Sequence, residues 1–312
     1  MKKSENEITP LFSYVGGKRW LKKELNFELE SIILKNKNID TYYEPFMGGL
    51  GAFFSNIEIL KKYNIKNVIL NDLNTSLYSF YKNLINNNLE LFELYDLHEL
   101  NFEKLVPKEI DKYHKIKDKN IIKEKLKLAS LFYKEKRAEF NQIKKEDSVE
   151  NAALFLFLQN HCFNGFYREN RKGDYNTAFN WEGRKSLNNA TKIKNMIKEL
   201  SYFNLVFLNE DYKNLKFEKN YILYVDPPYI NNILGTENNY NKDSFSIQDM
   251  KILIEMICSY NYIFSHYKND SIIDIFKGYN YNIKFVERKN TVSGHKETRG
   301  KIQTEIVISS SK

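Results

Sequence analysis

Cysteine is scarce in this chain, with two residues among 312. Cys162 and Cys258 are too few for a disulfide framework, and they do not form a paired metal-binding motif. The five histidines form no His-x-x-x-His pattern, and His161 beside Cys162 is more typical of a core or loop residue than of a metal ligand. The sequence therefore predicts no metal site and favours the cytoplasm as the compartment.

Long apolar runs are also absent. The longest one, residues 152–158, is far shorter than the roughly 20 residues that a membrane-spanning helix needs. The chain begins with the charged residues Lys2, Lys3 and Glu5 rather than with an apolar signal segment. We therefore expect no membrane span and no targeting to an envelope.

A phosphate-binding loop is the third absence. Gly17 and Lys18 look like its end, but that motif needs a glycine five residues before Gly17 and Ser or Thr after Lys18. Phe12 and Arg19 occupy those positions, so ATP binding by such a loop is not expected. The segment could instead hold a ligand on which Tyr14 packs while Lys18 meets a carboxylate. A basic turn without a ligand fits these residues equally well.

The abundant residues suit a globular protein with an anionic partner. A chain of 312 residues with 42% hydrophobic content can bury one substantial core and a smaller lobe. The formal net charge of +8 and the isoelectric point near 9.0 suit a polyanion. An A/T-rich genome would also enrich lysine, so charge alone does not identify the partner.

A glycine-rich segment joins a predicted strand to a predicted helix. Residues 41–43 favour a strand, residues 44–51 read Glu-Pro-Phe-Met-Gly-Gly-Leu-Gly, and a helix opens at residue 52. This is the first unit of a doubly wound nucleotide-binding fold, where missing side chains let the backbone approach a ligand. A second strand, residues 68–70, leads to Asp72 about twenty residues later, where such folds place an acid on ribose hydroxyls. The prediction is an adenosine ligand; a tight turn without a ligand is the alternative.

The segment Asp226-Pro227-Pro228-Tyr229 follows the apolar run of residues 221–225. Two prolines cannot donate to a strand ladder, so a buried strand must end here with Asp226 at its carboxyl edge. The Asp226 carboxylate and the Pro227 carbonyl could accept both hydrogens of a planar amino group, and Tyr229 offers a ring for stacking. The motif predicts a site for an exocyclic amine, with a solvated strand end as the alternative.

Together and in this order, the segments resemble the Dam-type, or alpha-class, DNA adenine-N6 methyltransferases, from residue 10 to about residue 308. Residues 163–170 also look like the family's Asn-Gly-x-x-Arg-x-Asn loop, and residues 299–308 like its C-terminal hairpin. The resemblance implies an α/β fold, a doubly wound Rossmann-like methyltransferase sheet of the seven-strand type with an inserted helical DNA-recognition domain.

The resemblance also implies a division into domains. Residues 1–75 and 201–312 would form the catalytic domain, and residues 76–200 the inserted helical recognition domain. Within this insert, strand signals fade and helical periodicity takes over. Its lysine-rich stretch, residues 108–145, is interleaved with Asp and Glu, which favours a solvated helix face over a DNA track.

The resemblance assigns S-adenosyl-L-methionine to the cofactor site. Tyr14 and Lys18 would hold its methionine part, Asp72 its ribose and Asp211 its adenine amino group. The full cofactor set is Tyr14, Gly16, Lys18, Glu44, Phe46, Gly48, Gly49, Asp72, Asp211, Tyr212 and Asp226, and the catalytic set is Asp226, Pro227, Pro228 and Tyr229.

Two loops are the candidate DNA-binding segments, residues 164–185 and residues 231–244. The first mixes aromatic, basic and amide side chains, which can read base edges and clamp phosphates. It lacks the proline and glycine that the family often carries there, so the DNA sequence that it reads stays open. The predicted DNA-binding set is Asn164, Tyr167, Arg168, Asn170, Arg171, Lys172 and Tyr240.

The implied reaction is methyl transfer to the N6 amino group of adenine in double-stranded DNA after base flipping. Tyr229, with Phe12 or Tyr240, would restore stacking on the flipped base. The implied protein is a cytoplasmic monomer without a metal, working in restriction-modification or in phage or bacterial DNA protection. GATC is the first recognition sequence to consider, and a separately acting restriction endonuclease is a further partner to consider.

Three other functions remain as alternatives. Cytosine-N4 methylation could use the same amine site. A protein-amide methyltransferase is disfavoured because that relative usually carries Asn in place of Asp226. A catalytically inactive DNA-binding relative is disfavoured because Lys18, Asp72 and Asp226 are all present.

Overall fold

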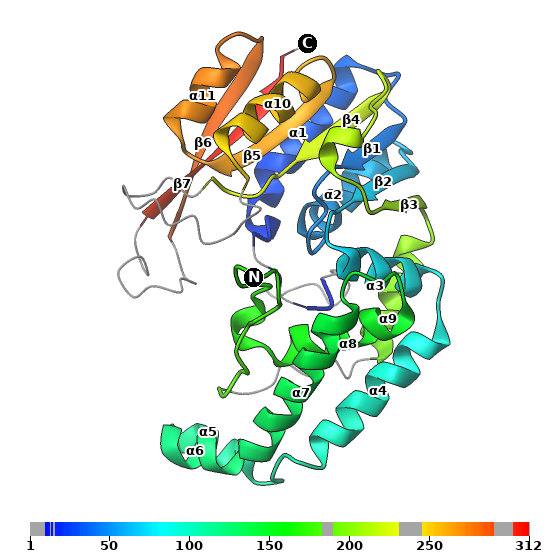
Figure 1. Ribbon diagram of the computed structural model, residues 1–312. Helices are drawn as coiled ribbons and strands as arrows, with labels where there is room; N and C mark the ends of the chain where they lie inside the picture. The colour runs from blue at the N-terminus through cyan, green and yellow to red at the C-terminus, as the bar shows by residue number, and fades with distance from the viewer. Residues whose placement is uncertain are drawn as a thin grey trace.

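The computed structural model describes residues 10–12, 14, 16–182, 190–230, 245–289 and 302–311. These ranges contain a seven-stranded sheet with the strand order β3-β2-β1-β4-β5-β7-β6 (Figure 1). The first five strands in this order are parallel, and β7 runs antiparallel between β5 and β6. The predicted α/β, Rossmann-like class is confirmed. The strands are β1 (Thr41–Glu44), β2 (Asn67–Asn71), β3 (Asn204–Leu208), β4 (Tyr221–Val225), β5 (Asn261–Tyr267), β6 (Tyr281–Lys289) and β7 (Ile302–Ser310).

Side chains at alternate positions of the parallel strands enter two separate cores. Tyr42 and Tyr224 belong to one apolar cluster, whereas their neighbours Tyr43 and Leu223 belong to the other. This is the period-two pattern of strands buried on both faces. Such strands read as continuous apolar runs in the sequence, which is why residues 221–225 could be recognised as a strand.

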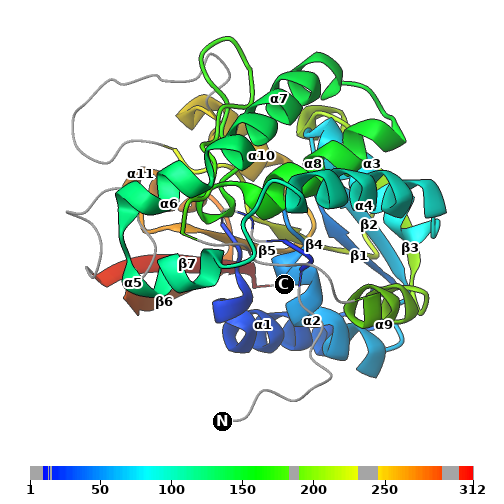
Figure 2. The same cartoon turned by 90° about the horizontal axis from the view of Figure 1, so that it is seen from below.

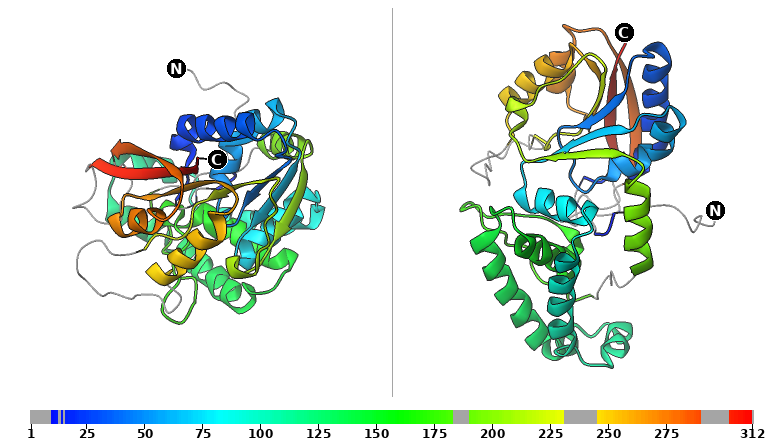
Figure 3. Two further views of the ribbon diagram at one scale, coloured as in Figure 1. Left: turned by 90° about the horizontal axis from the view of Figure 1, so that it is seen from above. Right: turned by 90° about the vertical axis from the view of Figure 1, so that its right-hand side faces the viewer.

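Helices cover both faces of the sheet. On one side lie α1 (Lys22–Lys35), α2 (Gly51–Lys62) and α9 (Ala190–Leu200), and on the other lie α10 (Ile247–Ile257) and α11 (Asp270–Phe276) (Figures 2 and 3). The described residues also contain three short 3-10 turns, which are η1 (Arg19–Leu21), η2 (Phe163–Gly165) and η3 (Tyr212–Asn214). No helix within the described ranges is long and apolar enough to cross a membrane.

A helical lobe extends from one end of the sheet (Figure 1). It contains α3 (Thr75–Ile85), α4 (Leu89–Glu103), α5 (Ile110–Ile116), α6 (Lys119–Lys125), α7 (Lys127–Ile143) and α8 (Val149–His161). Helices α3, α4 and α7 pack around α8, in which every residue from position 151 to 161 is buried. The apolar run of residues 152–158 is therefore a helix that is buried on all sides.

The lobe is not cleanly separated from the sheet. Helix α3 contacts β3, with the Tyr81 ring stacked on Phe207 at a centroid distance of 5.9 Å. Helix α9 lies in the layer that α1 and α2 form on the sheet (Figure 2). The division of the chain at residues 76 and 200 therefore stays a proposal.

The order of the strands reverses between β1 and β4. The chain passes from β1 to β2 on one side, and from β4 to β5 on the other. In open α/β sheets the crevice beyond the carboxyl ends of the strands at such a point is where ligands bind. This crevice is where the functional site should be found.

Candidate active site

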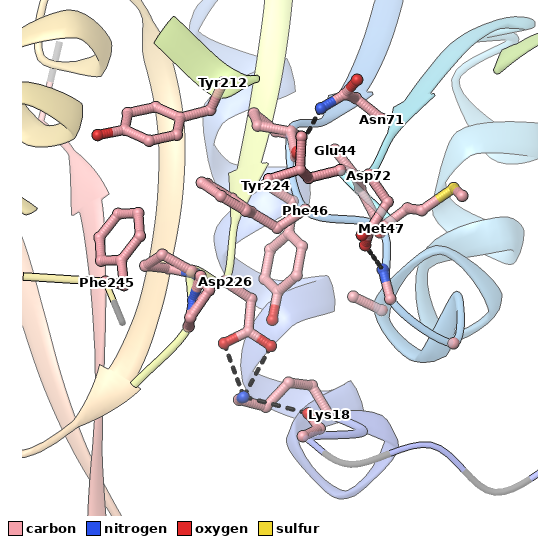
Figure 4. A pocket seen from close by; sticks show the side chains of 18 of the residues that line it. Lys18, Glu44, Phe46, Met47, Asn71, Asp72, Tyr212, Tyr224, Asp226 and Phe245 are labelled. Atoms are coloured by element: carbon pink, nitrogen blue, oxygen red, sulfur yellow. Dashed lines mark hydrogen bonds and ion pairs between the residues drawn. The ribbon is translucent and has the colours of Figure 1, made fainter. Parts of the chain in front are cut away.

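A cavity of about 680 Å³ lies at this switch point (Figure 4). Its walls come from the ends of β1, β2 and β4, the segments that follow β1, β2, β3 and β4, the start of α10 and the N-terminal segment. Its size suits a small-molecule site. The residues that line the cavity include all those predicted to bind the cofactor or to form the amine site. They are Tyr14, Gly16, Lys18, Glu44, Phe46, Gly48, Gly49, Asp72, Asp211, Tyr212, Asp226, Pro227, Pro228 and Tyr229. Their binding roles stay predictions.

The glycine loop after β1 packs directly on the N-terminal segment. Gly48 has a φ of +47°, a conformation that favours glycine. A Cβ on Gly49 would lie 2.7 Å from the Tyr14 Cβ, and one on Gly51 would lie 3.3 Å from the Lys18 backbone nitrogen. The missing side chains thus leave room for Tyr14 and Lys18 at the edge of the cavity.

Asp72 connects the glycine loop to the end of β2 through hydrogen bonds. Its Oδ2 accepts the backbone N–H of Gly48 at 3.0 Å, and its Oδ1 accepts that of Asn74 at 2.9 Å. Burial raises the pKa of Asp72, and the two backbone donors oppose that shift. Each carboxylate oxygen can accept a further hydrogen bond, so the predicted contact with ribose hydroxyls remains chemically open.

Asn71 is a site residue that sequence reasoning missed. Its buried side-chain amide donates to the Pro45 carbonyl at 2.9 Å and to the Glu210 carbonyl at 3.0 Å. One amide therefore ties together the segments that follow β1 and β3. The only signal in the sequence was its place beside Asp72 at the end of a predicted strand.

Three aromatic rings line one part of the cavity. The centroids of Phe46, Tyr212 and Phe245 lie 5.4 to 6.0 Å from one another (Figure 4). The Tyr212 hydroxyl donates to the Asp249 carbonyl at 3.1 Å, which orients its ring. Such a group of rings suits a flat aromatic ligand. The sequence had not assigned Phe245 to the cofactor.

The charged residues of the cavity are mainly acidic. Of its two lysines, Lys18 is paired with Asp226 and Lys213 with Asp249, each at 2.7 Å. Burial raises the pKa of Glu44 to about 8, although a hydroxyl that donates to Glu44 opposes the shift. A positively charged ligand would relieve this unfavourable burial of negative charge. The remaining carboxylates of the lining are Asp72, Glu210 and Asp211.

Lys18 holds the carboxylate of the amine site. Its Nζ lies 2.7 Å from both oxygens of Asp226, and it also donates to the Tyr229 hydroxyl and, at 3.2 Å, to the Gly16 carbonyl (Figure 4). The Lys18 side chain is 3% exposed and that of Asp226 is 17% exposed. Burial raises the pKa of Asp226, and the charge of Lys18 opposes this. The lysine that was predicted to meet a cofactor carboxylate thus pairs with a carboxylate of the protein.

Two buried hydroxyls on the neighbouring strands also support Asp226. Ser265 Oγ donates to Asp226 Oδ1 at 3.2 Å and shares a hydrogen bond of 2.8 Å with the Tyr224 hydroxyl. Neither Ser265 nor Tyr224 was predicted to belong to the site. Their meeting depends on the pairing of β4 with β5, which no local pattern specifies.

His266 supports the segment that follows the two prolines. Its Nε2 accepts the Ile230 backbone N–H at 3.4 Å, and its Nδ1 lies 2.9 Å from the Tyr267 carbonyl, so Nδ1 carries the proton. Its ring meets that of Tyr229 edge to face at 4.8 Å. Burial lowers the pKa of His266 to about 4, and the neutral ring is therefore the form that holds this segment.

The loop after α8 folds back on itself. Isolated bridges pair Cys162 with Phe179 and Glu169 with Tyr175. Asn170 forms the turn, because its Oδ1 accepts two backbone N–H groups of the turn at 2.8 and 3.0 Å. A structural role for Asn170 is thus visible, and its DNA contact stays a prediction.

The other predicted DNA-binding residues that the structure describes fall into two groups. The Tyr167 ring packs on Tyr14 and Tyr175 at 6.3 and 5.3 Å, and its hydroxyl donates to Glu169 at 2.9 Å. Arg168 is exposed, with its Nε bonded to a neighbouring amide oxygen at 2.8 Å. Asn164, Arg171 and Lys172 are also exposed, and Tyr240 lies outside the described residues.

The expectation that Phe12 stacks on a flipped base was wrong. Phe12 is 6% exposed, and its ring packs edge to face on Phe80 and Phe155 at 5.4 and 5.3 Å. It joins the N-terminal segment to α3 and α8, because an apolar ring gains more from burial there than from exposure at the cavity.

Comparison with known proteins gives the family. Residues 14–292 match the D12 class N6 adenine-specific DNA methyltransferases. The chain belongs to this family. It is 27% identical to the type II methyltransferase M.MjaIII of Methanocaldococcus jannaschii, over 78% of this chain and 77% of that protein. It is 23% identical to the type II methyltransferase M1.LlaDCHI of Lactococcus lactis subsp. cremoris, over 99% of this chain and 97% of that protein. It is 26% identical to the DNA adenine methylase of Haemophilus influenzae, over 96% of this chain and 93% of that protein.

We expect His266 to make the stability of this adenine-specific methyltransferase depend on pH. Its folded pKa of about 4 lies below the ordinary value of 6.5, so the unfolded chain binds the proton more readily between these values. The free energy of unfolding should fall as pH drops from 6.5 to 4, by up to about 1.4 kcal/mol per unit from this group. Denaturant titrations over this range should show a shallower loss for His266→Gln; equal slopes would contradict the assignment.

Proposed function

We propose that the cavity binds S-adenosyl-L-methionine beside a flipped adenine, and that the protein methylates the N6 amino group of adenine within a specific DNA sequence. The observation that carries this proposal is the continuity of one acidic, aromatic-lined cavity with the Asp226 carboxylate. Family membership supplies the reaction class. The acidic, aromatic-lined part of the cavity supports the proposed cofactor site, and the Asp226 carboxylate supports the proposed site of the adenine amino group.

The cavity fits the proposed cofactor in charge and shape. Phe46, Tyr212 and Phe245 suit its adenine ring, and the carboxylates Glu44 and Asp211 suit its cationic and amine-bearing parts. Bound S-adenosylmethionine would supply an electrophilic methyl group on a sulfonium. Asp72 would accept hydrogen bonds from the ribose while keeping the glycine loop in place.

The amine site has two acceptors for one amino group. The nitrogen of an exocyclic amine is a poor nucleophile, because its lone pair is delocalised into the ring. Asp226 and the Pro227 carbonyl, by accepting both hydrogens, would favour a pyramidal nitrogen with an available lone pair. The Asp226 charge would also offset the positive charge that develops on that nitrogen.

We propose that the loop after α8 reads the DNA sequence. Its exposed residues Asn164, Arg168, Arg171 and Lys172 suit bases and phosphates. GATC is the first sequence to test. The type II names of two relatives support a restriction-modification context, in which an endonuclease would act separately. We expect a monomer in the cytoplasm, where its DNA substrate lies.

The decisive experiment is methyl transfer from labelled S-adenosylmethionine to genomic DNA from a methylation-free host. Chromatography of the nucleosides should yield labelled N6-methyladenine, and sequencing of the modified bases gives the recognition sequence. Labelled N4-methylcytosine would favour the alternative amine, and unlabelled DNA would reject the proposal.

Asp226→Asn should lower the single-turnover rate in this assay by about 10²–10³-fold, the usual loss when a preorganised electrostatic contact is removed. The amide is nearly isosteric but lacks the charge, and it can turn its donor toward the amino group. Asp270→Asn, at the exposed start of α11, is the matched control and should keep the wild-type rate. An Asp226→Asn protein with the wild-type rate would refute the proposed role of Asp226.

Binding of the cofactor should release a proton from Glu44. With a pKa of about 8, this carboxyl is largely protonated at pH 7, and a nearby sulfonium would lower that pKa. Calorimetry in buffers of different ionisation enthalpy should therefore show release of up to about one proton with S-adenosylmethionine, and less with the uncharged thioether S-adenosylhomocysteine. Glu44→Gln should abolish the difference. Equal release with both ligands would place the sulfonium away from Glu44.

Arg168→Ala should weaken discrimination between cognate and scrambled duplexes by about 1–3 kcal/mol, because a guanidinium that reads a base edge supplies that much specificity. Binding at two salt concentrations separates this from a phosphate contact, which would change the salt slope by about one unit and leave discrimination intact. Lys277→Ala, immediately after α11, controls for loss of a positive charge. If neither quantity changes, the loop does not read DNA through Arg168.

A further inference from the structure

Glu305 is a buried carboxylate beside the amine site that the proposed reaction does not use. It lies on β7, where it pairs with Tyr267 of β5 and Val286 of β6, and it is 5% exposed. Its Oε1 accepts a hydrogen bond from the Tyr229 hydroxyl at 3.4 Å, whereas its Oε2 has no hydrogen-bond partner among the described residues. A buried carboxylate oxygen without a partner is unfavourable and calls for an explanation.

A chain of hydrogen bonds connects Asp226 to Glu305 through Lys18 and Tyr229. Lys18 Nζ donates to both oxygens of Asp226 and to the Tyr229 hydroxyl, and that hydroxyl donates to Glu305. Lys18 thus contacts one carboxylate directly and is connected to a second through the Tyr229 hydroxyl. Asp226 lines the cavity, whereas Glu305 is not among the residues that line it. Burial raises the pKa of Glu305, and the charge of Lys18 opposes this shift.

A second cation near Glu305 is Arg288, which contacts an aromatic ring. Arg288 lies on β6, which pairs with β7, and its charge also lowers the pKa of Glu305, by less than that of Lys18. Its guanidinium lies over the Trp20 ring at 5.0 Å. Lys18 is therefore the cation that the hydrogen-bond chain connects to Glu305.

The pair of Lys18 and Asp226 conflicts with the role proposed for Asp226, and this step rests on the proposed function. A target amino group is a hydrogen-bond donor, as is the Lys18 ammonium. Lys18 already bonds both oxygens of Asp226 and Ser265 bonds one of them, so an amino hydrogen that binds Asp226 competes with Lys18 for an oxygen. An ammonium displaced without another acceptor would be a buried, unpaired charge, which is strongly unfavourable. The Tyr229 hydroxyl, which Lys18 already contacts, leads directly to a carboxylate that has acceptor capacity left.

We propose that Glu305 is a positioning residue of the methylation reaction, which receives the Lys18 ammonium when the target amino group takes Asp226. The contact of Lys18 with Asp226 is the resting arrangement, and the contact with Glu305 is the arrangement with the amine bound. Glu305 acts through Lys18 and does not touch the base. This role explains why a carboxylate oxygen without a partner is buried behind Tyr229.

A double-mutant cycle of Glu305→Gln and Lys18→Met tests this coupling. The measured quantity is the single-turnover rate of methyl transfer to genomic DNA from a methylation-free host, at saturating S-adenosylmethionine. In the wild-type background Glu305→Gln should lower the rate about tenfold, because the amide cannot take the charge of Lys18. In the Lys18→Met background the same change should alter the rate by less than about twofold.

Two controls separate this role from a structural one. Glu305→Gln should bind S-adenosylmethionine with an affinity within about twofold of the wild type, since changes without a shared partner add nearly independently. Glu287→Gln, an exposed carboxylate on the same hairpin, should leave the rate unchanged. If Glu305→Gln fails to fold, Tyr229→Phe removes the connecting hydroxyl from a different segment and should show the same dependence on Lys18.

The outcomes are distinct. A tenfold loss that disappears in the Lys18→Met background supports the proposal. An equal loss in both backgrounds, or no loss in either, overturns it while leaving the proposed function intact. A wild-type protein that methylates no adenine overturns both.

Discussion

The buried ion pair of Lys18 and Asp226 is the contact on which the site depends. It joins residues 208 positions apart in the sequence, so the N-terminal segment closes over the end of β4. Burial of an ion pair requires that its donors and acceptors be satisfied. The ammonium meets this condition through Asp226, Tyr229 and the Gly16 carbonyl. The glycines after β1 are a precondition, because side chains there would push the N-terminal segment away.

The net charge of the chain and the charge of its cavity lining have opposite signs. The net charge of +8 suits a polyanion, while the cavity lining is mainly acidic and suits a cation. Fields of opposite sign can coexist because the cavity carboxylates are shielded by the protein around them, whereas the lysines of α5 and α6 face solvent. A basic composition alone would therefore have given the wrong sign for the cavity.

Local patterns predicted the parts of the site that depend on backbone geometry. The prolines after Asp226 end β4, and the glycines after β1 open the cavity, because each of these residue types restricts or frees the backbone wherever it occurs. The same reasoning failed for Phe12, which is core, and it missed Asn71, Ser265 and Glu305. An aromatic or polar side chain has no fixed role until its neighbours are known, and those neighbours come from distant strands.

The sequence by itself determined the α/β class, the strand that ends at Asp226, and many of the residues that gather around one cavity. Repeating apolar runs, prolines and glycines indicate the class and the strand end locally, whereas most of the cavity residues were assigned through the resemblance to a known family. Only the tertiary structure decided which partner each polar group takes. Lys18 meets Asp226 at the end of β4. Glu305 comes within reach of both through Tyr229, because β7 is inserted antiparallel between β5 and β6. Strand order is set by the summed packing of both sheet faces, and no short segment encodes that sum.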